Sequence, residues 1–201
     1  MEALLRMLLQ EVKGLREDVR SLRSCTLGDS RDKTDEMKDA IDHRDYDAFV
    51  EAYESGTWSC SMYSPLTYFC SATSVNLEDT FEWNMMQWFL LGEFNFNALD
   101  PTGYAPLHRV KSESVADYLC NNGADPNLVS PTWGVRPLQT RLYNPDPLPT
   151  LKVLIEYGGD IYATGRDGTS CFSEMEPSLR DVVVAYVQEC SRKAMGEDDS
   201  Q

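Results

Sequence analysis

The sequence has no run of about 18 uncharged apolar residues, the minimum for a membrane-crossing helix. Its apolar start, MEALLRMLLQ, carries Glu2 and Arg6 where a secretory signal has an uninterrupted apolar stretch. Six cysteines are scattered without a C-x-x-C pair, which in a chain able to build its own core indicates reduced, packed thiols. We therefore expect no membrane span and no targeting segment, and an intracellular location, cytoplasmic or nuclear.

Residue patterns that support catalysis or ligand binding are also scarce. Only two histidines occur, and no Cys or His pair has the spacing of roughly two to five residues that zinc sites use. Phosphate-binding and dinucleotide-binding glycine motifs are absent. The acidic stretches at 36–47 and 197–199 lack the partnered spacing of catalytic carboxylates, so we interpret them as solvated. These absences predict a protein that is not an enzyme, with no metal and no cofactor.

The net charge is −15, and it is unevenly distributed. Residues 1–34 carry seven Lys or Arg against six Asp or Glu, which leaves −16 for the rest of the chain. So acidic a surface repels nucleic-acid phosphates and anionic lipid head groups. We expect no nucleic acid and no membrane among the partners, and a basic or neutral protein fits the charge better.

The first 24 residues show the heptad pattern of a coiled coil. The a and d positions are Leu5, Leu8, Val12, Leu15, Val19 and Leu22. Glu11 and Asp18 then fall at g, with Arg16 and Arg23 at the next e, which makes attractive pairs between two parallel helices. The pattern predicts self-association through residues 1–24. Docking of the same stripe on the chain's own body stays an alternative, because about three heptads is near the lower limit for a stable coil.

Composition divides the remainder of the chain into three segments. Residues 25–36 are polar and contain a glycine, which is typical of a linker. Residues 37–193 form a repeat domain, and residues 194–201 are an acidic tail. At the start of the domain, residues 40–56 are expected to form one helix, the second helix of a capping half-repeat.

One pattern recurs through the domain, as repeat proteins require. The clearest copy reads Gly103-Tyr-Ala-Pro-Leu-His108, followed by a helical segment that ends Gly-Ala-Asp-Pro-Asn127. Weaker copies lie at 63–97 and 134–160, and a degenerate fourth begins near residue 167. The prolines Pro65, Pro106 and Pro137 are 41 and 31 residues apart, which brackets a period of about 33 residues.

This pattern resembles the ankyrin repeat, whose signature G-x-T-P-L-H precedes a second helix ending in L-L-x-x-G-A-D-x-N. The resemblance covers residues 38–193 and implies an all-α ankyrin-repeat solenoid of about four helix-turn-helix repeats with hairpin loops, behind an N-terminal coiled-coil helix. Proline is expected in the first turn of the first helices, and Gly123 in a left-handed conformation past a helix end. The resemblance also implies that His108 bonds backbone between neighbouring repeats. Asn97 and Asn127 are expected to be turn residues, and the family's asparaginyl hydroxylation stays open for both.

The resemblance further implies a protein-binding adaptor that captures its partner with hairpin tips and inner helices. Alignment on the motif places these residues at the tips: Pro101, Thr102, Tyr104, Thr132, Trp133, Val135, Arg166 and Asp167. Trp133 and Tyr104 are the best candidates for interface anchors, since exposed aromatics are the usual anchors. Two alternatives stay open: these rings pack on adjacent tips or on the loop at 144–149, or the whole chain is only a structural scaffold that forms multimers.

Overall fold

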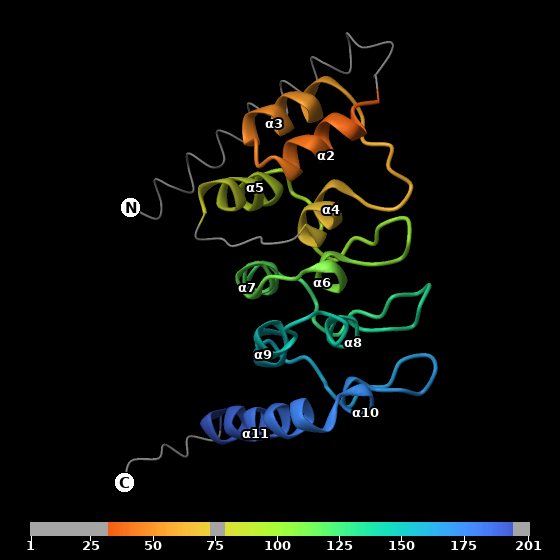
Figure 1. Cartoon of the computed structure of the whole chain (residues 1–201), viewed down its shortest axis with the longest axis vertical. Helices are drawn as coiled ribbons and strands as arrows, with labels where there is room; N and C mark the ends of the chain where they lie inside the picture. The colour runs from red at the N-terminus through yellow and green to blue at the C-terminus, as the bar shows by residue number, and fades with distance from the viewer. Residues whose placement is uncertain (1–31, 73–78, 195–201) are drawn as a thin grey trace. The chain divides into compact units, whose positions relative to one another are not determined.

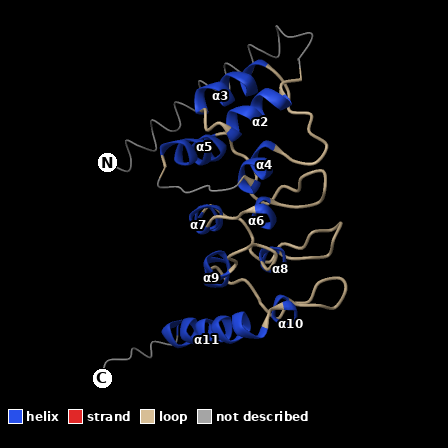
Figure 2. Ribbon diagram, viewed as in Figure 1, coloured by secondary structure: helices blue, strands red, loops and turns tan. Residues whose placement is uncertain are grey.

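The computed structural model describes residues 32–72 and 79–194. Over these ranges the regular structure is helical, apart from two isolated bridge pairs, as Figure 2 shows. The all-α class predicted from the sequence is confirmed at this level. The heptad residues at 1–24, most of the predicted linker and the acidic tail from residue 195 lie outside the described residues.

The chain divides into two compact units. Of the described residues, the N-terminal unit contains 32–60 and 79–95, and the C-terminal unit contains 61–72 and 96–194. The candidate site lies wholly in the C-terminal unit.

In the N-terminal unit, α2 (Thr34–Asp42) packs on α3 (Tyr46–Ser55), and α5 (Thr80–Leu91) contacts α3. The helix α2 begins inside the expected linker. The expectation of one helix over residues 40–56 is wrong, because the chain turns sharply at 43–45. Arg44 there has a left-handed φ of 61°, and the Asp45 carboxylate caps α3 by accepting the N–H of Ala48 at 2.9 Å.

The core of this unit is aromatic, and an ion pair closes it at one side. Phe49 of α3 is fully buried and meets Trp88 of α5 edge to face, with ring centroids 5.2 Å apart. The Arg44 guanidinium lies 2.7 Å from the carboxylates of both Glu82 and Asp79. Glu82 is buried, so the turn between α2 and α3 is bound to α5 through a buried charge.

In the C-terminal unit, helices alternate between two rows (Figure 1). The short helices are α4 (Pro65–Ser71), α6 (Pro106–Arg109), α8 (Pro137–Arg141) and α10 (Cys171–Glu174). The other row is α7 (Glu113–Asn121), α9 (Leu148–Glu156) and α11 (Pro177–Ala194). Consecutive members of each row contact one another. The loops that lead into α6, α8 and α10 project on the side away from α7, α9 and α11.

Local chemistry explains where these helices begin and end. Pro65, Pro106 and Pro137 are each the first residue of a short helix, where the missing N–H leaves no hydrogen bond unmade. Past α7, Gly123 has a φ of 90°, which confirms the predicted left-handed turn. The next turn is tied to it, because the Asn127 amide donates to the carbonyl of Gly158 at 2.8 Å.

Apolar side chains fill the space between the two rows. Residues buried there include Leu66, Phe69, Leu107, Val115, Leu119, Leu138, Leu151 and Leu154. Three thiols, Cys70, Cys120 and Cys171, are buried as well, and burial raises the pKa of each to about 12. Cys70, Cys120 and Cys171 are free thiols in the core, as predicted for packed cysteines.

Candidate functional site

Three hairpin loops of the C-terminal unit, at 100–105, 130–136 and 165–170, form what we call the hairpin row. Each is closed by a backbone hydrogen bond, for example from the Asp100 N–H to the Tyr104 carbonyl at 2.8 Å and from the Ser130 N–H to the Val135 carbonyl at 2.9 Å. The Asp100 carboxylate also accepts the N–H groups of Thr102 and Tyr104, at 2.9 and 3.0 Å. The loops therefore have a shape fixed by their own hydrogen bonds.

Neighbouring loops of the row are bonded to each other. The Ser130 hydroxyl donates to the Gly103 carbonyl at 2.6 Å, and the Arg166 N–H donates to the Gly134 carbonyl at 3.0 Å. Both glycines have positive φ, and a Cβ on either would collide with the next loop, at Thr132 and Arg166 respectively. The loops are thus stacked in register.

Four side chains form a ladder along this row, which we call the aromatic–arginine ladder: Tyr63, Arg109, Tyr104 and Trp133. The Arg109 guanidinium lies between two rings, 4.8 Å from Tyr63 and 4.4 Å from Tyr104. Tyr104 in turn stacks on Trp133 with centroids 6.1 Å apart and planes 10° apart. Trp133 ends the ladder with 57% of its surface exposed.

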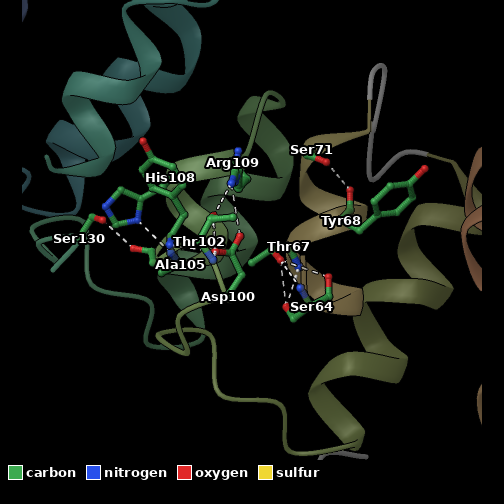
Figure 3. A network of polar contacts seen from close by, with 12 residues as sticks. Ser64, Thr67, Tyr68, Ser71, Asp100, Thr102, Ala105, His108, Arg109 and Ser130 are labelled. Carbon is green, nitrogen blue, oxygen red and sulfur yellow. Dashed lines mark hydrogen bonds and ion pairs between the residues drawn. The ribbon is translucent and has the colours of Figure 1, made fainter. Parts of the chain in front are cut away.

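Polar contacts hold Arg109 and Trp133 in the ladder. Arg109 donates to the Thr102 hydroxyl at 2.7 Å and pairs with the buried Asp100 carboxylate at 3.5 Å, as Figure 3 shows. The indole N–H of Trp133 donates to the Thr102 carbonyl at 3.0 Å. Trp133 is therefore exposed on one side and packed on the adjacent hairpin tip on the other. This packing is one of the alternatives that the sequence left open.

His108 contacts the ladder at Tyr104, with ring centroids 5.4 Å apart, and joins two loops. Its Nδ1 accepts the Ala105 N–H at 3.2 Å (Figure 3), and its Nε2 lies 3.3 Å from the Val135 carbonyl, to which it donates when neutral. The predicted backbone bonding of His108 is confirmed. Burial, with smaller contributions from Arg141 and Arg109, lowers its pKa to about 4, so the ring is neutral at physiological pH.

The predicted tip residues differ in exposure. Those that are exposed are Pro101, Thr132, Trp133, Arg166 and Asp167, and those that are half-buried are Thr102, Tyr104 and Val135. The Thr169 backbone N–H and hydroxyl, which donate to the Asp167 carboxylate, lower its pKa. The structure thus brings Thr102, Tyr104 and Trp133 into one contact.

Sequence reasoning missed Tyr63 and Arg109 as members of this surface. A signal for Tyr63 existed, because it stands two residues before Pro65 as Tyr104 stands two before Pro106. Nothing local marks Arg109, whose ring partners come from two different loops.

The described part of the chain offers little for other kinds of site. No group of three or more His, Cys, Asp or Glu side chains within it could hold a metal ion. Nor does it contain a helix both long and apolar enough to span a bilayer. Neither a family model nor a curated protein matches this chain. A functional assignment therefore depends on the chain's own residues.

Proposed function

We propose that this chain is a non-enzymatic adaptor of the ankyrin-repeat type, which binds a protein partner through its hairpin row and the adjoining short helices. The observation that carries the proposal is the aromatic–arginine ladder and its exposed end at Trp133. Tryptophan, tyrosine and arginine are the side chains most enriched among interface hot spots. All three types are gathered here.

The rigidity of the row supports the same function. Loops that are bonded to one another lose little conformational freedom on binding, so more of the contact energy becomes affinity. The Ser130 hydroxyl and the Arg166 N–H supply such bonds between loops. Glycines at the two contact points let the loops approach closely.

The heptad at 1–24 favours self-association as a second part of the proposal. Two chains joined there would present two hairpin rows, and the second contact with a bivalent partner would then form at high effective concentration. If the rows bind nothing, the same heptad leaves a structural scaffold as the alternative function. The compartment proposed for either function is intracellular.

Affinity capture with the full chain as bait tests the proposal. Proteins retained by the wild-type chain should be lost with Trp133→Ala, because this change removes the exposed end of the ladder. Trp83→Ala is the matched control, since it removes another half-exposed tryptophan, 48% exposed, from α5 in the other unit. Equal capture by wild type and Trp133→Ala, or equal loss in both variants, would exclude the hairpin row as the binding surface.

A further inference from the structure

The short-helix row contains polar N–H groups that find no acceptor among the described residues. Arg141, at the end of α8, is only 3% exposed, and its Nε and Nη1 have no hydrogen-bond partner. The same holds for Nε of Arg109 and for the side-chain amide nitrogen of Asn144. Buried donors without partners are rare in proteins, because each costs about 1–3 kcal/mol.

Positive charge is also uncompensated here. Arg141 donates through Nη2 to the His108 carbonyl and to the Thr140 hydroxyl, both neutral acceptors. The charged group acting on it is Arg109, which repels it, while the nearby Cys70 thiol is neutral at physiological pH. The Asp100 carboxylate pairs with Arg109, whereas Arg141 pairs with no carboxylate among the described residues.

This local excess opposes the charge of the chain as a whole. The segments 113–127 and 148–162, which contain α7, α9 and their turns, carry five acidic residues and one lysine. The arginines Arg109, Arg136, Arg141 and Arg166 lie instead on the short helices and hairpins. Between residues 100 and 162, most acidic residues therefore lie on α7, α9 and their turns.

We propose that Arg109 and Arg141 form a receptor for a carboxylate, supplied by an aspartate or glutamate in a peptide segment of the protein partner. This inference rests on the proposed function and specifies its partner. Arg109, with 21% of its side chain exposed, makes the contact, because guanidinium and carboxylate pair through charge-assisted hydrogen bonds. Arg141 supplies the second positive charge behind it.

The surroundings of the pair suit a peptide. Tyr143, which is 82% exposed, is close enough to Tyr104 to act on its hydroxyl electrostatically. The Tyr104 ring lies against the Arg109 guanidinium, and the exposed Tyr143 offers a second ring and hydroxyl group to the residues flanking the carboxylate. The net charge of −15 still favours neutral or basic residues elsewhere in the partner. We therefore expect a peptide segment of the partner with one acidic residue, flanked by neutral residues that contact the tyrosines.

The test follows the arginine Nε–H signals of the full chain by NMR after ¹⁵N labelling of arginine. The probes are two blocked pentapeptides of glycine and serine, one with a central glutamate and one with glutamine. The glutamate peptide should shift the Arg109 signal and bind about tenfold more tightly than the glutamine peptide. Arg180 is the internal control, because its Nε is likewise buried without a partner but lies at α11.

The proposal would be overturned if the two peptides shifted the Arg109 signal equally, or if the glutamate peptide shifted the Arg180 signal as much as that of Arg109. Both comparisons use the wild-type chain and need no variant. Arg109→Gln should then weaken the glutamate peptide about tenfold, and Tyr143→Ser, at an exposed position, should weaken it without loss of folding. Failure of the wider function looks different. If capture depends on Trp133 but the glutamate peptide binds no better than the glutamine peptide, only the carboxylate receptor is rejected. If the glutamate peptide binds preferentially but no protein is captured through Trp133, the adaptor function is rejected.

Discussion

His108 and Gln139 occupy the same position in consecutive short helices and make the same two bonds with different chemistry. Each accepts the N–H of the residue three positions earlier, at 3.2 Å from Ala105 and 3.0 Å from Arg136. Each also reaches a backbone carbonyl in the next hairpin, at 3.3 Å. A histidine can do this only while its ring is neutral, whereas glutamine has no such condition.

The first prediction is that His108 makes stability depend on pH in mild acid. Its pKa is about 4 in the fold against 6.5 ordinarily, so below pH 6.5 the unfolded chain binds a proton that the folded chain does not. Stability is therefore present above about pH 6.5 and lost as the pH falls toward 4. Between pH 7 and pH 5 the loss should be about 2 kcal/mol.

Urea unfolding of wild type and His108→Gln at the two pH values measures this difference. The glutamine variant removes the titrating group and keeps the bonding pattern that Gln139 shows to be workable. A wild type and a variant that lose the same stability between pH 7 and pH 5 would contradict the assignment.

The second prediction concerns Trp133, which carries two structural contacts as well as an exposed face. Trp133→Ala should lower the free energy of unfolding by about 1 kcal/mol, because it removes the stack on Tyr104 and the bond to Thr102. Leu107→Ala should cost more, about 2–5 kcal/mol, since it opens a cavity in the core. Thermal and urea unfolding of both variants tests the order, and a larger loss for Trp133→Ala would make that ring mainly structural.

At the scale of elements, the hairpins and turns are specified by where the backbone must take unusual conformations. The hairpin glycines Gly103, Gly134 and Gly168 all have positive φ. Two of them also face the next hairpin closely, whereas Gly168 faces open space. The cost of a positive φ and the cost of a collision with the next hairpin can therefore be measured separately within the hairpin row.

The third prediction uses that contrast. Gly168→Ala should cost about 1 kcal/mol, the strain of a left-handed alanine. Gly134→Ala should cost about 2–4 kcal/mol, because its Cβ would also meet the Arg166 backbone and side chain. Urea unfolding compares the two, and equal losses would show that the stacked loops can separate at no cost.

The turn between α2 and α3 depends instead on charge. Arg44→Ala should destabilise the N-terminal unit by about 3 kcal/mol, since it leaves the buried Glu82 carboxylate without its cation. Adding Glu82→Gln to this variant should recover part of the loss, because the buried charge is then gone. Unfolding followed by tryptophan fluorescence measures both, and a double variant less stable than the single one would refute the explanation.

At the scale of the whole molecule, the open question is assembly through residues 1–24. Deleting these residues should convert an oligomer into a monomer and leave the helical circular dichroism of the remainder intact. The double change of Val12 and Val19 to Asp should act in the same way, because each charge would enter the a-position seam. Light scattering decides, and an unchanged monomeric mass with and without the segment would exclude the coiled coil.

The sequence by itself determined the features that depend on neighbouring residues. Proline marks the starts of α4, α6 and α8, and Gly123 marks the turn after α7, because both act on their own backbone dihedrals. The burial of Leu107 likewise follows from the position of an apolar residue within its motif.

Only the tertiary structure decided which side chains meet. The ladder joins Tyr63, Arg109, Tyr104 and Trp133 across loops that are tens of residues apart, and no local pattern states which faces of those loops touch. The break at Arg44 was missed for the same reason, since the carboxylates that hold it come from distant residues, Glu82 of α5 and the N-cap residue Asp79. Composition gives the total charge, but only the packing of the chain decides where arginines outnumber the carboxylates beside them. That packing depends on contacts between residues far apart in the sequence.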